Sequence, residues 1–315
     1  MTLHAIVLGA AAGGGFPQWN SAGPGCLRAR AGDPMAKPRT QASLAVSGDG
    51  GERWLVLNAA PDIAAQIAAT PALHPRAAPG RIRHSPIAAV AVTGAEVDTI
   101  AGLLTLRERH AFGLYAGAKG LAALAENPIF NVLDPSLVPR RELPLDRPVE
   151  VTDGEGAPLG LVLEAFAVPG KVALFQEKAG ADPGRADQGE TIGLRVAAAS
   201  GGGASLFFIP GCAAMTAALR ARLSGAACVL FDGTLFRDEE MILAGAGQKT
   251  GVRMGHMSVG GPGGTLAAFA DIPGGRRILI HINNTNPVLL EDSPERAAVH
   301  AAGWEVAEDG MEIRL

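Results

Sequence analysis

Short apolar runs recur along the whole chain and are bounded by glycine, proline and small polar residues. Runs of this kind are typical of buried β-strands. The pattern predicts strands at 5–8, 44–46, 54–57, 87–92, 112–115, 161–168, 191–197, 205–209, 228–231 and 278–282, and a small terminal hairpin made of 304–306 and 311–315.

Apolar residues spaced three or four positions apart predict helices between these strands. Ile63 and Ile67 lie on one face of a helix that starts after Pro61-Asp62. Further helices are predicted at 100–109, 119–126, 213–223, 238–243, 266–269 and 294–302. The glycine-dense segment 245–264 is predicted to be a loop. The segment 135–158 is rich in proline and charge, which indicates a surface excursion or a seam between two halves.

The order of these elements indicates the fold class. Strands come in runs of two or three between helices, in both halves of the chain. A doubly wound parallel sheet would alternate strand and helix more strictly. The pattern therefore predicts an α/β (α+β) protein in which two mixed β-sheets pack face to face, flanked by helices. We expect one domain over residues 1–315, because no clear linker separates the halves and no repeat is evident.

The charge balance excludes several classes of partner. The net charge is −4 and Lys and Arg form no block, so neither nucleic acid nor an anionic membrane is expected as a partner. No stretch of about 18 apolar residues is free of charged or turn residues, so no transmembrane helix is predicted. The first residues lack the basic region of a signal peptide. Three widely spaced cysteines favour a reducing compartment, so we expect a cytoplasmic protein.

The segment 277–288 carries the strongest candidate for chemistry. An apolar run gives way at His281, and three asparagines follow, Asn283, Asn284 and Asn286. A histidine where a buried strand ends, with amides nearby that can fix its ring, is built like a supported metal ligand. The alternative is a core histidine whose ring is satisfied by a backbone carbonyl. His281 alone does not decide between the two.

Three more residues favour the metal interpretation, because Asp98, Asp232 and His256 each end or follow an apolar run of their own. Two imidazoles and two carboxylates can hold one Fe(II) or Zn²⁺ ion with open positions. The alternatives are that Asp98 caps the helix that follows it, and that His256 is a solvent-facing loop residue. We predict Asp98, Asp232 and His281 as metal ligands, and His256 with Asp232 as the catalytic pair.

The glycine-rich segment 9–15 follows a strand, as nucleotide-binding loops do. It lacks the Gly-Lys-Ser/Thr of a P-loop, and Pro17 falls where a Rossmann helix would begin. We therefore interpret it as a structural turn that lets the backbone pass close to another strand or to a ligand.

Several long blocks of the sequence share their pattern with a known family. They are Val7-Leu8-Gly9, Gly13 through Asn20, Pro38 through Gln41, Asn58 with Pro61-Asp62-Ile63, Val97-Asp98, Ala101 through Glu108, Phe231 through Thr234, Thr250-Gly251, Met254-Gly255-His256 and His281 through Pro287. From end to end, the chain resembles the B proteins of pyrroloquinoline quinone (PQQ) biosynthesis.

This resemblance implies a metallo-β-lactamase fold, an αββα sandwich, in agreement with the strand pattern. It also implies an iron-dependent oxygenase that hydroxylates the tyrosine of a cross-linked Glu-Tyr precursor. The alternative is a non-catalytic carrier of PQQ or its precursor in transport toward the periplasm. Expected partners are the precursor, other PQQ-biosynthesis proteins and a second copy in a homodimer. We expect substrate contacts from Gln18, Arg107, Asn283 and Asn284.

The chain departs from the wider superfamily, whose His-x-His-x-Asp-His loop binds two metals. The loop positions fall on Gly94, Glu96, Asp98 and Thr99, and the bridging aspartate, near Pro210-Gly211, is absent. The comparison implies at most one metal and disfavours a two-zinc hydrolase. Thr99 stands where the family has histidine. A hydroxyl is a poorer Fe(II) ligand than an imidazole, so we expect weakened metal binding.

A second departure concerns structural zinc. The family carries Cys-x-Cys-x-x-Cys after Trp19-Asn20, and here these positions are Ser21, Gly23 and Cys26. One thiolate cannot make a tetrahedral zinc site. We therefore predict that Cys26 is a remnant and that structural zinc is absent.

Overall fold

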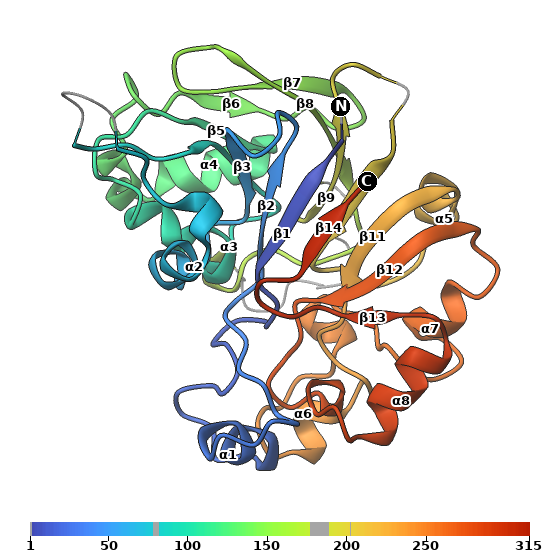
Figure 1. The fold of residues 1–315 in the computed structure, drawn as a ribbon. Coiled ribbons are helices and arrows are strands. Elements are labelled where there is room, and N and C mark those ends of the chain that lie inside the picture. Colours follow the sequence, from blue (N-terminus) through green and yellow to red (C-terminus); the bar gives the residue numbers. More distant parts are fainter. Residues whose placement is uncertain (1, 78–81, 177–188, 202) are drawn as a thin grey trace.

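Two seven-stranded mixed β-sheets pack face to face, with helices on their outer sides, as Figure 1 shows. The computed structural model describes residues 2–77, 82–176, 189–201 and 203–315. The αββα arrangement that the strand pattern predicted is confirmed. The prediction that 1–315 form one domain stays a prediction.

The first sheet is built mainly from the N-terminal half, and the C-terminal strand completes it. Its order is β14 (Glu312–Arg314), β1 (His4–Gly9), β2 (Ser43–Ser47), β3 (Trp54–Leu57), β4 (Ile87–Val92), β5 (Gly113–Ala116) and β6 (Arg140–Glu142). From β3 to β6 neighbouring strands are parallel, whereas β1 and β2 pair antiparallel.

The second sheet mirrors the first in its mixed pairing. Its order is β13 (Glu305–Val306), β12 (Gly274–Ile280), β11 (Ala226–Asp232), β10 (Ser205–Ile209), β9 (Ile192–Ala198), β8 (Pro158–Ala167) and β7 (Pro148–Thr152). From β10 to β13 neighbouring strands are parallel, and β7 to β10 pair antiparallel.

Short helices connect the strands. The α-helices are α1 (Pro24–Arg30), α2 (Ile63–Ala69), α3 (Val97–Ile100), α4 (Ala118–Glu126), α5 (Ala217–Leu223), α6 (Glu240–Leu243), α7 (Thr265–Ala268) and α8 (Pro294–Ala301). The 3₁₀ helices are η1 (Pro71–Leu73), η2 (Ala101–Leu104), η3 (Pro128–Val132), η4 (Leu174–Gln176), η6 (Val252–Met254) and η7 (Pro287–Leu289).

The core lies in three layers that follow from the strand pattern. Side chains alternate across each strand, so one face of each sheet meets the other sheet and the second face meets helices. Leu57 and Leu163 belong to the layer between the sheets. Phe231 and Trp304 pack outside the second sheet, and Ile63 packs outside the first.

The terminal hairpin prediction is wrong. Strand β13 pairs in parallel with β12, whereas β14 pairs antiparallel with β1, so the two segments join different sheets. An edge strand offers a row of unpaired backbone groups to any segment that reaches it. Each segment therefore pairs with the sheet edge that it reaches, β13 with β12 and β14 with β1.

Three other boundaries differ from the sequence interpretation. The segment 135–158 contains β6 and β7, whose charged residues suit strands at sheet edges. The helix predicted at 100–109 ends at Leu104. The helix predicted at 213–223 begins at Ala217, because the Thr216 hydroxyl accepts a hydrogen bond from the Leu219 amide and caps it. Helix α1 was not predicted.

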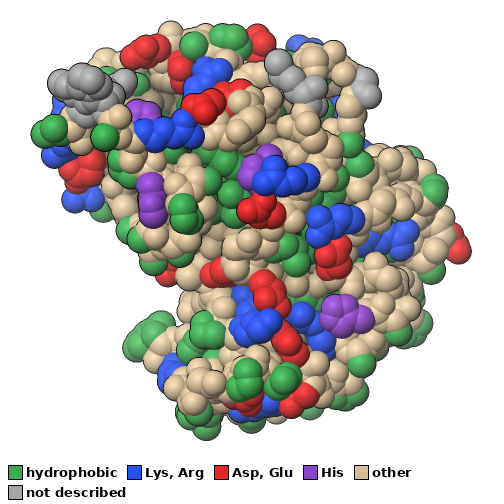
Figure 2. Space-filling model, in the orientation of Figure 1, with side chains coloured by type: hydrophobic (Ala, Val, Ile, Leu, Met, Phe, Trp, Pro, Cys, Tyr) green, Lys and Arg blue, Asp and Glu red, His purple; other side chains and the backbone are tan. Residues whose placement is uncertain are grey.

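The visible surface agrees with the composition. On the face in Figure 2, acidic and basic side chains are interspersed rather than gathered by sign. Within the described ranges, no helix combines the length and the apolar character needed to cross a membrane.

Candidate metal centre

Parallel strands of both sheets end close to one another. Strand β4 leads to Asp98, β11 ends at Asp232, and β12 is followed by His281. The carboxyl ends of parallel strands lie at the same edge, where loops form binding sites. A β-bridge between Ala11 and Ile282 joins the loop after β1 to the segment after β12, so the two sheet edges meet here.

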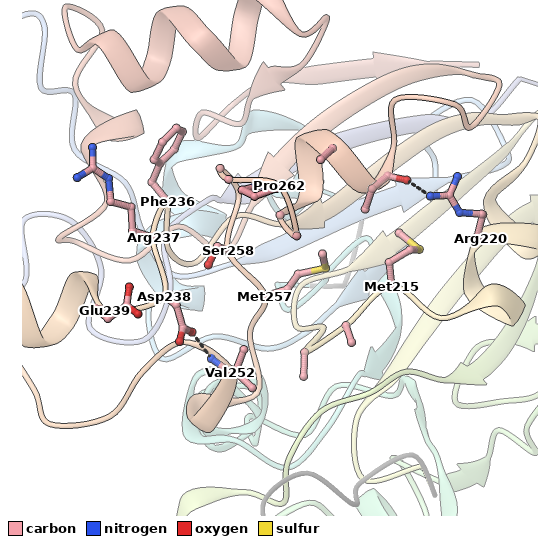
Figure 3. Close-up of a pocket in the computed structure, with 18 residues that line it drawn as sticks. Met215, Arg220, Phe236, Arg237, Asp238, Glu239, Val252, Met257, Ser258 and Pro262 are labelled. Atoms are coloured by element: carbon pink, nitrogen blue, oxygen red, sulfur yellow. Dashed lines mark hydrogen bonds between the residues drawn. The ribbon is translucent and has the colours of Figure 1, made fainter.

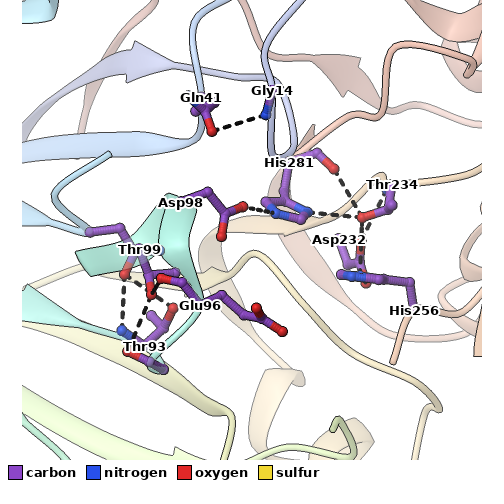
Figure 4. A network of polar contacts seen from close by, with 12 residues as sticks. Gly14, Gln41, Thr93, Glu96, Asp98, Thr99, Asp232, Thr234, His256 and His281 are labelled. Atoms are coloured by element: carbon purple, nitrogen blue, oxygen red, sulfur yellow. Dashed lines mark hydrogen bonds and ion pairs between the residues drawn. The ribbon is translucent and has the colours of Figure 1, made fainter. Parts of the chain in front are cut away.

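His281 has a left-handed backbone conformation, with φ of 58°. Residues other than glycine adopt this conformation rarely, and mostly where the surrounding structure enforces it. The Gly233 amide donates to the Ile280 carbonyl and fixes the end of β12 just before the turn. The imidazole then lies between Asp98 and Thr234, as Figure 4 shows.

Asp98 and His281 form a mostly buried pair. Oδ2 of Asp98 lies 2.9 Å from Nε2 of His281, and the side chains are 14% and 13% exposed. Burial alone would lower the pKa of His281, but the hydrogen bond and charge of Asp98 outweigh it and raise that pKa. Burial would raise the pKa of Asp98, and the His281 hydrogen bond and charge instead lower it. Both shifts have the sign of an ion pair.

Asp232 and His256 form a second pair. Oδ2 of Asp232 lies 2.7 Å from Nδ1 of His256 and also accepts a hydrogen bond from the Cys212 amide at 2.8 Å. The Asp232 side chain is fully buried. The rings of His256 and His281 are stacked, with centroids 5.2 Å apart. His256 therefore belongs to the centre and is not a solvent-facing residue.

Thr234 joins the two pairs through its hydroxyl. Its Oγ1 lies 2.6 Å from Oδ1 of Asp232, 3.0 Å from Nδ1 of His256 and 2.9 Å from Nδ1 of His281. The sequence pointed to Thr234 only as part of the Asp-Gly-Thr block after β11. Its role was missed because 47 positions separate it from His281.

The four predicted residues fit one divalent ion. Donor atoms of Asp232, His256 and His281 lie within 4.8 Å of one another, and Asp98 is joined to this trio through His281. Zinc takes nitrogen and oxygen ligands at about 2.0–2.2 Å, so two ligands of one ion lie roughly 3 Å apart. The separation of 2.9 Å between Asp98 Oδ2 and His281 Nε2 matches this distance.

The glycine-rich loop 9–15 lies against this centre. A Cβ atom on Gly13 would stand 3.6 Å from Oδ2 of Asp98, so the backbone of this loop lies beside the Asp98 carboxylate. The Ala12 amide donates to the Ile282 carbonyl, and the Gly14 amide donates to Gln41 Oε1. The loop thus passes close to the segment after β12. The glycine-rich sequence predicted such a close approach.

Asp98 does not cap its helix. The residue lies inside α3, for which Glu96 occupies the N-cap position, and its carboxylate faces His281 instead. The Thr99 hydroxyl donates to the Glu96 carbonyl at 2.7 Å and lies 3.2 Å from the Gly94 carbonyl. The Thr99 hydroxyl is therefore hydrogen-bonded to the backbone of its own turn.

The asparagines after β12 do not fix the His281 ring, so that expectation is wrong. Asn283 Nδ2 donates to Thr285 Oγ1 at 2.7 Å, and Asn284 Nδ2 donates to Gln18 Oε1. The hydroxyl of Thr234, in the turn after β11, reaches the ring instead.

Three of the four residues predicted for substrate contact lie near one another. Gln18 is hydrogen-bonded to Asn284, and Asn284 Nδ2 lies 3.3 Å from Asn283 Oδ1. Arg107 is half-exposed in the turn after η2, where it donates to the Leu104 carbonyl. Substrate contacts from all four stay a prediction.

A separate cavity of about 950 Å³ lies beside the chain that follows Thr234 and His256 (Figure 3). Phe236, Met257 and Ser258 contribute to its wall. Its described lining contains none of the four residues of the metal centre.

The fold and this centre define a protein of the metallo-β-lactamase class, and residues 53–282 match the family model of the Beta-lactamase superfamily domain. The chain belongs to the coenzyme PQQ synthesis protein B family, and so to a family of PQQ biosynthesis. It is 60% identical to coenzyme PQQ synthesis protein B of Gluconacetobacter diazotrophicus over 309 residues, which cover 98% of each chain. The protein of the same name from Gluconobacter oxydans is 53% identical, with 99% of each chain covered.

A solved structure is also similar. The Zn(2+)-bound PqqB from Methylobacterium extorquens is 50% identical, has a TM-score of 0.92, and is matched over 99% of this chain and 100% of its own. This finding overturns our prediction that zinc is absent, and it gives no support to iron. The prediction failed because it weighed only the thiolates around Cys26. Zinc also accepts imidazole and carboxylate ligands, which Asp232, His256 and His281 provide.

Proposed function

We propose that this chain binds one divalent metal ion through Asp98, Asp232 and His281, with His256 beside them as a base, and uses the ion in a step of PQQ biosynthesis. The observation that carries this proposal is the convergence of four titratable side chains, three from strand ends and His256 from the loop after η6. Three of them hold donor atoms within 4.8 Å, and the fourth lies 2.9 Å from one of these.

The reaction that we propose is hydroxylation of the tyrosine ring of a Glu-Tyr-derived precursor. One atom of O₂ enters the ring and the other leaves as water, so a two-electron donor must accompany the substrate. A bound redox-active divalent ion would supply the electron transfer to O₂ that this step needs, and its charge would lower the pKa of an oxygen group that it holds.

The residues divide this work between them. Asp98 Oδ2 and His281 Nε2 face each other and offer adjacent donors to the ion. Asp232 Oδ2 accepts a hydrogen bond from the Nδ1 proton of His256, which leaves Nε2 of that ring as the base for the phenol proton. The stacking of His256 on His281 keeps this base next to the donors.

The test uses the full-length protein, stripped by a chelator and reloaded with single divalent ions. Each preparation receives a tyrosine-containing Glu-Tyr precursor, ascorbate and isotopically labelled O₂. We expect label in the precursor with at least one ion. Zinc undergoes no redox change, so the zinc-loaded protein is expected to bind the precursor without incorporating label.

The carrier alternative predicts a different result. PQQ or the precursor would then bind equally well to the stripped and the reloaded protein, and no ion would give labelled product. That pair of outcomes would overturn the proposed oxygenation, and a stripped protein that takes up no divalent ion would overturn the metal centre itself.

A further inference from the structure

Thr234 is a buried hydroxyl residue at the junction of the two carboxylate–histidine pairs. It is 4% exposed, and its Oγ1 lies within hydrogen-bonding distance of Asp232 Oδ1 and of Nδ1 in both stacked histidines. It also lies 3.0 Å from the His281 carbonyl. A hydroxyl has one hydrogen and two lone pairs, so these four neighbours compete for it.

The distances assign the hydrogen. Oδ1 of Asp232 is the nearest neighbour, at 2.6 Å, and a charged acceptor makes the stronger bond. The hydroxyl therefore donates to Asp232, and its lone pairs face the ring nitrogens. Nδ1 of His256 already has Asp232 Oδ2 at 2.7 Å, so His281 is the ring that depends on Thr234.

From this arrangement we infer that Thr234 is the positioning residue of the centre. Its hydroxyl accepts a hydrogen bond from Nδ1–H of His281, which fixes the tautomer and leaves the Nε2 lone pair for the metal beside Asp98. The inference rests on the proposed metal centre. It names Thr234 as the group that prepares the His281 ring to bind the metal.

The turn that carries Thr234 is itself held rigidly. The Thr234 amide donates to Asp232 Oδ1 at 3.0 Å, and Asn286 Nδ2 donates to the Gly233 carbonyl at 2.8 Å. A Cβ atom on Gly233 would stand 3.0 Å from that of Leu279, so the chain passes close to β12 at this point. The hydroxyl is thereby placed before any metal arrives.

The first experiment measures Zn²⁺ affinity by competition with a chromophoric chelator. Thr234→Val keeps the shape of the side chain and removes the hydroxyl, and Thr234→Ser restores the hydroxyl. Loss of a group that orients a metal ligand weakens binding by about 10–100-fold. We expect a loss of this size in Thr234→Val and an affinity close to that of the unchanged protein in Thr234→Ser.

Thr265→Val is the matched control, because Thr265 is fully buried and its hydroxyl donates to a backbone carbonyl, that of Ser258. We expect this variant to bind Zn²⁺ as the unchanged protein does. Equal Zn²⁺ affinity in Thr234→Val and the unchanged protein would overturn the inference. Absence of Zn²⁺ binding in the unchanged protein would instead overturn the metal centre on which it rests.

The second measurement needs no Thr234 variant and so is independent of whether Thr234→Val folds. Long-range ¹H–¹⁵N spectra of the zinc-loaded protein report which ring nitrogen of each histidine carries a proton. The His281 signals are first assigned in the metal-free protein, by their loss in metal-free His281→Asn, and are then followed through a zinc titration of the unchanged protein. We expect the proton on Nδ1 and the metal on Nε2, and the opposite tautomer would refute the role of Thr234.

Discussion

Asp98 and His281 are 183 positions apart in the chain, yet Oδ2 of one lies 2.9 Å from Nε2 of the other. The first follows β4 in one sheet and the second follows β12 in the other. The pair therefore fastens the two sheets together at the edge where their parallel strands end. It also sets two donor atoms at the separation that adjacent ligands of one ion require.

The Asp98–His281 pair gives the metal-free protein a defined pH dependence. The raised pKa of His281 means that its stabilising contribution is fully present below the unfolded value of about 6.5 and is lost as the pH rises through the folded value. The lowered pKa of Asp98 means that its contribution is present above about 3.9 and is lost as the pH falls. We expect Asp98→Asn to lower the free energy of unfolding more at about pH 6 than at about pH 9.

Urea unfolding of the metal-free protein at both pH values checks this prediction. Asp292→Asn is the control, since Asp292 is an exposed carboxylate paired with Arg28, which stays charged at both. Its effect is expected to be small and equal at the two pH values. An equal effect of Asp98→Asn at both would contradict the prediction.

Removing the His281 imidazole is expected to abolish stoichiometric Zn²⁺ binding. Asparagine is the substitution of choice, because it tolerates the left-handed backbone of this position better than alanine does. The loss should exceed the 10–100-fold typical of removing only a supporting group. Metal content after dialysis measures it, with His74→Asn as control, since His74 Nε2 contacts the Ala68 carbonyl on the surface. Full zinc content in His281→Asn would remove His281 from the ligand set.

Gly102 allows the Asp98 segment to dock on the chain after β3. A Cβ atom there would stand 2.2 Å from the Ala60 carbonyl oxygen, and the Gly102 amide donates to the Ala59 carbonyl at 2.8 Å. We expect Gly102→Ala to lower the free energy of unfolding by about 1–3 kcal/mol through overpacking. Gly203→Ala, where a Cβ atom has no neighbour within 4 Å, should change it little. Denaturant unfolding measures the free energy of unfolding of both variants. Equal values for Gly102→Ala and Gly203→Ala would contradict the prediction and show that the chain around Gly102 can relax.

Asn286 supports the turn that carries Thr234. It is 1% exposed, donates to the Gly233 carbonyl and accepts a hydrogen bond from the Val288 amide. Asn286→Asp would set a carboxylate oxygen against that carbonyl, and we expect a loss of roughly 1–3 kcal/mol or more, together with weaker Zn²⁺ binding.

Asn127→Asp is the comparison for this variant. Asn127 also donates to a backbone carbonyl, that of Ala123, but it is only partly buried and lies at the end of α4. It should lose less stability and keep its Zn²⁺ affinity. Undiminished Zn²⁺ affinity in a folded Asn286→Asp protein would separate this turn from the metal centre.

Much of the fold was open to prediction from the sequence. Buried strands such as β4 and β12 are continuous apolar runs bounded by turn residues, and this local signal needs no knowledge of partners. The segment at β6 and β7 hid its strands because edge strands face water and carry charge. Helix boundaries shifted where a local contact decided them, as at Thr216.

The candidates for the centre could also be recognised from local sequence, because Asp232 and His281 lie where an apolar run stops, Asp98 follows such a run, and His256 lies in the glycine-dense loop. Tertiary structure alone decided how they are connected. Asp98 is hydrogen-bonded to His281 across the two sheets, and His256 is hydrogen-bonded to Asp232. The His281 ring is supported by Thr234 and not by the asparagines that we expected. The physical reason is that hydrogen bonds follow distance in space, and parallel strands bring residues from remote parts of the chain to the same edge.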